Sequence, residues 1–167
     1  MTAAVEYMPM RISFDLDDTL ILTGADARLE PLPRSPLRWL YRERLRQGAV
    51  ALCARLRAAG WKVSIYTTSQ RSEAYIRRLF GLYGIALEQV VNLQKHEDMV
   101  QRGRAQILPS KMPSRFGMDL HVDDDLTVKQ NGEAYGFRVV LVDKHDTDWA
   151  DKVWTEAHRV AARKQKH

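Results

Sequence analysis

The stretch from Ile12 to Leu20 joins a short run of strand-forming residues to a group of side chains that can do chemistry. Asp15, Asp17, Asp18 and Thr19 follow one another at the end of this run. Apolar neighbours normally bury such a segment, and burying carboxylates without compensating partners costs free energy. A bound cation or neutralising side chains would offset that cost, and either arrangement indicates a functional site.

The spacing of Asp15 and Asp17 suits hydrolysis through a covalent intermediate. Residues two apart in an extended chain point to the same side, so both carboxylates could face one substrate. A carboxylate nucleophile divides a difficult hydrolysis into two easier steps. A second carboxylate that transfers a proton to or from the reacting oxygen typically contributes ~100- to 10,000-fold in rate. The alternative is that Asp17, Asp18 and Thr19 are turn residues after a strand.

Strand-like and helical segments alternate along the chain around these residues. We expect strands at residues 11–15, 61–67, 89–92, 119–123 and 137–142, and helices at 49–59, 71–80, 95–102, 113–116, 126–135 and 148–162. This alternation predicts an α/β fold, a three-layer, Rossmann-like, doubly wound parallel sheet. Residues 1–167 are expected to form a single domain, in which 19–48 make a flap and a short basic insert near the site.

Several polar residues lie where these expected strands end. The ligand crevice of a parallel sheet lies beyond the carboxyl ends of its strands. Asp15, Thr67 and Asp123 each lie at or near such an end, and Asp124 follows directly, so one crevice could collect them. A hydroxyl there can orient an oxyanion without adding charge. The alternative for the hydroxyl group is that Thr67 and its neighbours cap the next helix.

The sequence Asp15-Leu16-Asp17-Asp18-Thr19 has the form Asp-x-Asp-x-Thr and resembles the first motif of the haloacid dehalogenase (HAD) superfamily, whose members are mostly magnesium-dependent phosphohydrolases. The resemblance implies that Asp15 attacks phosphorus and becomes an aspartyl phosphate. It implies that Asp17 acts as general acid and then as base. With an aspartate at position 17 the motif resembles that of the superfamily's phosphatases, whereas its ion pumps and dehalogenases do not match at this position. The resemblance therefore implies phosphomonoester hydrolysis.

The second and third HAD motifs are a strand-end hydroxyl and a lysine. Thr67 resembles the hydroxyl that binds a phosphate oxygen, and Ser69 could replace it if the strand runs longer. The lysine neutralises the nucleophile and the phosphate; Lys111 is the preferred candidate, because it lies just before the segment that leads into the last acidic strand, and Lys95 is the alternative. The expected substrate-binding residues are Thr19, Thr68, Ser69 and Lys95.

Asp123-Asp124 resembles the fourth HAD motif, which holds magnesium, although Val122 replaces the family's usual glycine. Mg²⁺ prefers oxygen ligands in octahedral geometry. The Asp15 carboxylate, the Asp17 backbone carbonyl and Asp123 are the expected ligands, with Asp124 binding directly or through water. Which of Asp123, Asp124 and Asp125 contacts the ion stays open, with Asp123 expected first.

Composition and charge favour a soluble protein that acts on an anion. The chain has 167 residues, a net charge of +5 and a pI near 9.5. Residues 28 to 57 contain eight arginines but only two acidic residues, Glu30 and Glu43. This excess of positive charge favours an anionic substrate, and a solvated basic face is the alternative. No apolar stretch is long enough for a membrane span and no secretory signal is expected. The single cysteine, Cys53, is expected to be a buried hydrophobe and fits a reducing cytoplasm.

The segments between the motifs leave little room for the cap domain of many HAD proteins, so this chain resembles the capless or minimal-cap branch. Substrates there include phosphoproteins and nucleic-acid ends, and a nucleotide or sugar phosphate is equally compatible. The oligomeric state stays open. The contrasting interpretation is a catalytically silent HAD-like basic module that binds nucleic acid or a protein. The sequence contains no Gly-x-x-x-x-Gly-Lys loop, Gly-x-Gly-x-x-Gly fingerprint or Gly-x-Ser-x-Gly elbow.

Overall fold

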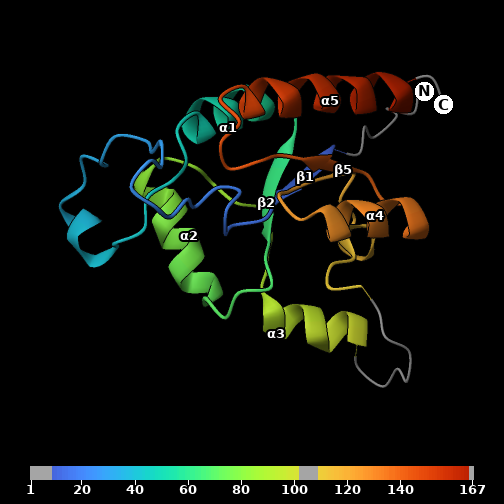
Figure 1. Cartoon of the computed structure of the whole chain (residues 1–167), viewed down its shortest axis with the longest axis horizontal. Coiled ribbons are helices and arrows are strands. Elements are labelled where there is room, and N and C mark those ends of the chain that lie inside the picture. The colour runs from blue at the N-terminus through green and yellow to red at the C-terminus, as the bar shows by residue number, and fades with distance from the viewer. Residues whose placement is uncertain (1–8, 102–108, 166–167) are drawn as a thin grey trace, which may run out of the picture.

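The computed structural model describes residues 9–101 and 109–165, whose strands form one parallel sheet of five strands in the order β3-β2-β1-β4-β5 (Figure 1). The strands are β1 (Arg11–Phe14), β2 (Lys62–Tyr66), β3 (Val90–Val91), β4 (Leu120–Asp123) and β5 (Val139–Leu141). In the register of the central strand, Phe14 pairs with Ile65 on one side and with Val122 on the other. The expected doubly wound α/β sheet is confirmed.

Helices follow the strands much as the periodicity predicts. The α-helices are α1 (Ala49–Ala58), α2 (Glu73–Leu82), α3 (Leu93–His96), α4 (Leu126–Tyr135) and α5 (Trp149–Lys164), and α3 continues into a π-helical turn, η2 (Glu97–Gln101). Residue 102, where the expected third helix ends, lies outside the described residues. Two 3-10 helices, η1 (Pro36–Leu40) and η3 (Pro113–Phe116), complete the set. All of residues 15–48 are described and they contain no α-helix, which agrees with a minimal cap.

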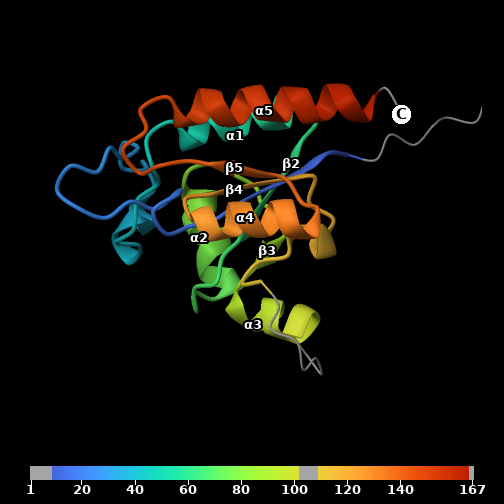
Figure 2. The same ribbon diagram turned by 45° about the vertical axis from the view of Figure 1, so that its right-hand side comes forward.

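Alternation along the strands gives the sheet two chemically different faces. One face is apolar, and with α1, α2 and α5 it forms the larger core; it carries Ile12, Phe14, Val63, Ile65, Leu120 and Val122. Figure 2 shows α1 and α5 together on one side of the sheet and α4 on the other. Burying each large aliphatic side chain contributes about 1.5–3 kcal/mol, so this face supplies much of the stability.

The opposite face of the sheet is partly polar, although it is equally buried. It carries Ser13, Ser64 and His121, each 0% exposed, beside a smaller apolar cluster around Tyr66 and Val128. The polar groups are paired, since Ser13 Oγ lies 2.8 Å from His121 Nδ1 and Ser64 Oγ accepts the Gln89 backbone N–H at 3.2 Å. Paired buried groups avoid the desolvation cost of unpaired ones. This face therefore leads polar side chains to the carboxyl edge of the sheet.

A flap after β1 is held down by a buried arginine. Arg46 is 2% exposed, and its guanidinium donates to the backbone carbonyls of Thr19, Asp143 and Asp146 at 3.3, 2.7 and 2.9 Å. The same group lies over the Trp149 ring, 4.7 Å from its centroid. Arg46 thus joins the flap to the loop after β5. It is a structural member of the basic segment rather than part of an exposed basic face.

Two expectations from composition can be placed on the structure. Cys53 is 1% exposed, and burial raises the pKa of its thiol to about 12, as a small buried hydrophobe requires. Within residues 9–101 and 109–165, none of the helices combines the length and apolarity needed to traverse a bilayer.

Close packing between α4 and β5 makes Gly132 a test of the fold. A Cβ added there would lie 2.5 Å from the Phe137 carbonyl oxygen and 3.1 Å from Val139 Cγ2. We expect Gly132→Ala to lower the free energy of unfolding by about 1–3 kcal/mol, measured by denaturant unfolding. Gly81→Ala is the matched control, because Gly81 lies in the last turn of α2 and a Cβ there meets nothing within 4 Å. It should stabilise the protein by ~0.5–1 kcal/mol; equal stability of the two variants would contradict this packing.

Candidate active site

The carboxyl ends of three neighbouring strands bring the predicted residues to one edge of the sheet. Asp15 follows β1, Thr67 follows β2, and Asp123 ends β4. The backbone N–H of Asp15 donates to Val122 O at 2.9 Å, so the sheet hydrogen bonding continues into the site. One carboxylate oxygen from each of Asp15, Asp123 and Asp124 lies within 4.8 Å of the others. The sequence-predicted acidic residues therefore converge.

Lys111 lies between two of these carboxylates. Its Nζ is 2.8 Å from Asp15 Oδ1 and 2.6 Å from Asp123 Oδ2, and the residue is only 4% exposed. Burial lowers the pKa of a lysine, but the two carboxylates outweigh it and raise the pKa of Lys111. Lys95, the other candidate, instead donates to the Val90 carbonyl at 3.4 Å. The structure thus favours Lys111 as the cation beside the predicted nucleophile.

Asp123 already has internal partners on both of its oxygens. Its Oδ2 accepts from Lys111 and lies 2.9 Å from His121 Nε2, and its Oδ1 accepts the Asp125 backbone N–H at 3.0 Å. Burial raises the pKa of this carboxyl, but the hydrogen bond and charge of His121, together with Lys111, outweigh it and lower that pKa. Since a carboxylate accepts, His121 Nε2 donates, and Ser13 Oγ, 2.8 Å from Nδ1, accepts from the charged ring or donates to the neutral one.

Asp124 lies closer to solvent and has fewer partners. Thr19, which is completely buried, donates its hydroxyl to Asp124 Oδ1 at 3.2 Å. Thr19 therefore positions a carboxylate, whereas the sequence suggested it as a substrate-binding residue. Burial, then the charges of Asp123 and Asp15, raise the pKa of Asp124.

The site has more negative charge than its lysine neutralises. Burial raises the pKa of Asp15, and the charge of Asp123 adds to this rise, although Lys111 opposes both. A cation between Asp15 and Asp124 would offset the carboxylate repulsion that adds to the effect of burial on both pKa values. The donor set consists of oxygens alone, which fits Mg²⁺. The residues present therefore fit the metal that the sequence predicted.

Asp17 is held by an arginine that the sequence analysis missed. Both of its carboxylate oxygens accept from the guanidinium of Arg71, at 3.0 and 2.7 Å, and Arg71 also binds Glu43 through Nε and Nη2. The Tyr75 hydroxyl donates to the other Glu43 oxygen at 2.9 Å. Asp17 is 56% exposed, so its carboxylate is oriented but open to a ligand. The available signal was that Arg71 follows the polar residues 67–70, which come directly after β2.

Hydroxyls at the end of β2 occupy different environments. Thr67 is 1% exposed, and its Oγ1 accepts the Ser69 backbone N–H at 3.1 Å while retaining its own hydrogen for donation. Ser69 Oγ is buried and has no hydrogen-bond partner among the described residues. Thr68 is exposed. Thr67 and Ser69 therefore keep the capacity to bind an oxyanion.

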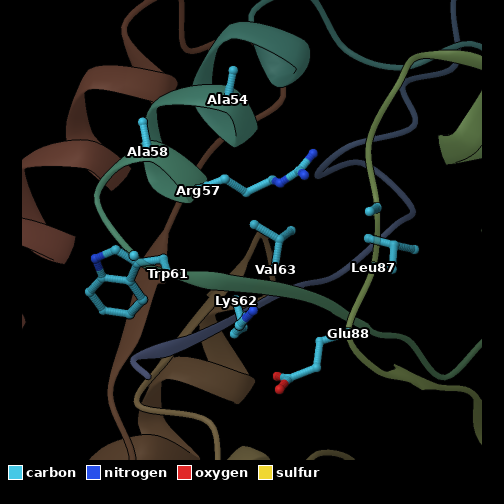
Figure 3. A pocket seen from close by; sticks show the side chains of 10 residues that line it. Ala54, Arg57, Ala58, Trp61, Lys62, Val63, Leu87 and Glu88 are labelled. Carbon is cyan, nitrogen blue, oxygen red and sulfur yellow. The ribbon is translucent and has the colours of Figure 1, made fainter. Parts of the chain in front are cut away.

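A hollow in the surface lies at the other edge of the sheet, away from these residues. Figure 3 shows side chains from the end of α1, the start of β2 and the loop before β3 around a hollow of about 730 Å³. Arg57, Lys62 and Glu88 are its charged lining residues. The start of β2 is the amino edge of the parallel sheet, opposite the edge where Asp15 lies. This hollow is therefore separate from the candidate active site.

The ion pairs of Lys111 give a test of the site's construction. Removing one partner from a buried ion pair costs about 3–5 kcal/mol, so Lys111→Met should destabilise the protein by this amount in denaturant unfolding. Lys95→Met removes the same charge from a residue without a carboxylate contact among the described residues. It should change stability by less than about 0.5 kcal/mol. Equal effects of the two substitutions would contradict the ion pairs described for Lys111.

Comparisons with known proteins concern the fold. No protein-family model matches the sequence, and no curated protein matches it. The HAD domain of effector protein Lem4 from Legionella pneumophila is 13% identical, with a TM-score of 0.50 over 88% of this chain and 93% of that one. A chain of the Pnkp1/Rnl/Hen1 complex is 16% identical, with a TM-score of 0.51 over 82% of this chain and 47% of that one.

A third solved structure is D,D-heptose 1.7-bisphosphate phosphatase from B. bronchiseptica, complexed with magnesium and phosphate. It is 17% identical, with a TM-score of 0.49 over 88% of this chain and 99% of that one. The parallel sheet order, the acidic strand ends and the likeness to the Lem4 domain agree with one another. The chain has the α/β fold of the HAD superfamily.

Proposed function

We propose that this protein is a Mg²⁺-dependent phosphomonoester hydrolase that works through an aspartyl phosphate on Asp15. The observation that carries the proposal is the position of Lys111, 2.8 Å from Asp15 and 2.6 Å from Asp123, with Asp124 alongside. A carboxylate nucleophile beside an anionic phosphate needs nearby positive charge. A buried ammonium at that point, in an excess of carboxylates, meets this need.

In the first step a carboxylate oxygen of Asp15 forms a bond to phosphorus, and the bond from phosphorus to the leaving oxygen breaks. Asp17, in its protonated form, gives its proton to that leaving oxygen. In the second step Asp17 takes a proton from water, the water oxygen bonds to phosphorus, and the bond to Asp15 breaks. Lys111 and the hydroxyls of Thr67 and Ser69 would bind the phosphoryl oxygens, since they lie at the same sheet edge.

Arg71 orients the proton-transfer residue in this scheme. Both oxygens of Asp17 are bound by Arg71, so the carboxylate must give up at least one of these bonds to carry a proton. Glu43 binds the same guanidinium and can retain it when Asp17 turns toward the substrate. The ion-pair network thus keeps Asp17 at the mouth of the site and leaves it able to move.

The metal ligands that we propose are the carboxylates of Asp15 and Asp124 and the backbone carbonyl of Asp17. Asp123 was the first choice from sequence, but both of its oxygens have internal partners, so we assign it to hold Lys111. Asp124 has fewer partners and a raised pKa. When bound, Mg²⁺ supplies positive charge to the phosphoryl oxygens.

The proposal is tested with a generic aryl phosphate, with Mg²⁺ and after chelation by EDTA. We expect Mg²⁺-dependent release of inorganic phosphate that Asp15→Asn abolishes, since an amide is a poor nucleophile. Asp17→Asn should lower kcat by about 100- to 10,000-fold through loss of proton transfer. Asp18→Asn, a neighbouring carboxylate without a role, is the matched control. Activity that survives Asp15→Asn would refute the aspartyl-phosphate mechanism.

Metal binding has its own test in thermal unfolding. Mg²⁺ at about 100 times its Kd should stabilise the wild-type protein by about 2.7 kcal/mol. Asp124→Asn should remove most of this gain while raising the melting temperature of the metal-free protein, because it removes a carboxylate whose pKa is raised. This gain in melting temperature should disappear as the pH falls toward 3.8, the ordinary pKa of an aspartate, because the wild-type carboxyl also becomes neutral there.

Asp125→Asn is the control for the metal test. Asp125 caps α4 by accepting the Thr127 N–H at 2.7 Å, and asparagine caps equally well. This variant should keep the full response to Mg²⁺. A normal Mg²⁺ response in Asp124→Asn would refute the proposed ligand.

A catalytically silent binding module is the second candidate, because several arginines of the basic segment have no carboxylate partner in the described part of the chain. Wild-type protein and Asp15→Asn would then be equally inert on a broad panel of phosphate esters. Both would bind a polyanion with a steep dependence on salt.

A further inference from the structure

We propose that residues 31–42 bind single-stranded nucleic acid and present its terminal phosphate to Asp15. The binding side chains form what we call the insert surface: Arg34, Leu37, Arg38, Trp39, Leu40 and Arg42. The inference rests on the proposed phosphatase function and adds the substrate class. It comes from the exposure and charge of these side chains and from their position relative to the candidate site.

The insert surface exposes large apolar side chains that the fold does not use. Trp39 is 78% exposed, Leu40 73% and Leu37 56%, all on η1, which Ser35 caps by accepting the Leu37 N–H at 3.2 Å. None of the residues of η1 is buried. A contiguous exposed apolar group of this kind marks a binding site more often than a solvated surface.

The charge of the insert surface is uncompensated. Residues 31–42 contain no acidic residue, and Arg34, Arg38 and Arg42 form no ion pair with any described residue. The flanking acids are engaged elsewhere, since Glu30 accepts the backbone N–H groups of Gly48 and Val50, and Glu43 binds Arg71. A ligand with several negative charges would therefore meet three available guanidinium groups.

One of these guanidinium groups is combined with the exposed ring. The Arg38 guanidinium lies 4.9 Å from the centroid of Trp39, and it also donates to the Pro33 carbonyl. Alternating cations and an exposed indole suit a strand whose bases stack while its phosphates pair with arginine. A bilayer suits them less, because inserting Trp39 into hydrocarbon would take the Arg38 charge with it. An acidic peptide would use the charges but has no base to stack on the ring.

Residues next to the insert surface in the chain connect it to the candidate site. A single β-bridge between Leu29 and Arg46 pairs the two ends of the insert, and a second one, between Ile21 and Leu45, joins its C-terminal end to the segment that follows β1. Figures 1 and 2 show η1 protruding next to α2. The Tyr41 ring packs on the Tyr75 ring of α2, with centroids 5.2 Å apart. Glu43, which follows the insert surface in sequence, pairs with Arg71, and Arg71 pairs with Asp17.

Binding is measured first, by fluorescence anisotropy of labelled single-stranded DNA and RNA about 12 nucleotides long, a length that covers one binding groove. The protein is Asp15→Asn, which cannot turn the ligand over. We expect the triple variant Arg34→Gln, Arg38→Gln, Arg42→Gln to weaken binding at least tenfold. The slope of log affinity against log salt should fall by about 0.7 for each arginine removed. Trp39→Ala should weaken binding about tenfold through lost stacking.

The control removes the same charge elsewhere. The triple variant Arg55→Gln, Arg57→Gln, Lys62→Gln alters the amino edge of the sheet, where the last two line the hollow in Figure 3. It should bind within about twofold of the parent, since exposed charges beyond a Debye length are largely screened. Melting temperatures of all variants check that each one folds.

Turnover is measured second, in the wild-type background, with 5′- and 3′-phosphorylated oligonucleotides and an aryl phosphate. We expect kcat/KM for at least one oligonucleotide, divided by kcat/KM for the aryl phosphate, to fall at least tenfold in the Arg34/Arg38/Arg42 variant. The control triple variant should keep this ratio. An aryl phosphatase that binds no oligonucleotide overturns the inference and leaves the phosphatase proposal standing.

Other results also separate the two proposals. Oligonucleotide binding that the control variant weakens equally would overturn the insert surface, because net charge alone would then explain it. Tighter binding to an acidic phosphopeptide or to anionic phosphatidylserine vesicles, lost with Trp39→Ala, would replace nucleic acid by that ligand. Binding at the insert surface without hydrolysis of any phosphate would support the surface and refute the phosphatase.

Discussion

The buried contact of Lys111 with Asp15 and Asp123 is the interaction on which the site depends. An ammonium and two carboxylates are removed from water together, and each is stable there only while the others remain. His121 and Ser13 extend the network, so that β1 and β4 are joined by side chains as well as by their backbones. Asp15, the proposed nucleophile, is consequently fixed by the same contacts that neutralise it. Rigid placement of this kind lowers the reorganisation needed during reaction.

The division of the sheet into two faces explains how so polar a network can exist in a small protein. The apolar face, with Ile12, Phe14 and Val122, packs under α1, α2 and α5 and supplies most of the hydrophobic stabilisation. The opposite face can therefore hold Ser13 and His121 in pairs. Strand alternation makes this division automatic, because neighbouring residues in β1 and β4 point to opposite faces. The same strands thus supply core residues and polar residues at alternate positions.

The sequence predicted the fold and the position of the acidic residues well, because both follow from local patterns. Strand and helix periodicity identified the sheet, and the carboxyl-end rule brought Asp15 to Asp123 without any knowledge of distance. The choice between Lys111 and Lys95 could not be made from spacing, since it depends on which lysine the chain folds back toward Asp15. The hydrogen bonds of Thr19 to Asp124 and of Asp123 to the Asp125 backbone were not predicted either, because hydrogen-bond partners have no sequence signature.

Arg71 shows most clearly what the sequence could not reveal. An arginine just before a helix is ordinarily a surface residue, yet here Arg71 binds Asp17 on one side and Glu43 on the other. One guanidinium thereby connects the proposed proton donor to the segment that follows the insert surface. A ligand that drew Glu43 away would alter the partners of Asp17 without touching Asp15 or Lys111. The ion pairs of Arg71 therefore connect the C-terminal end of the insert to Asp17, the proposed acid–base residue, through side chains that are in contact.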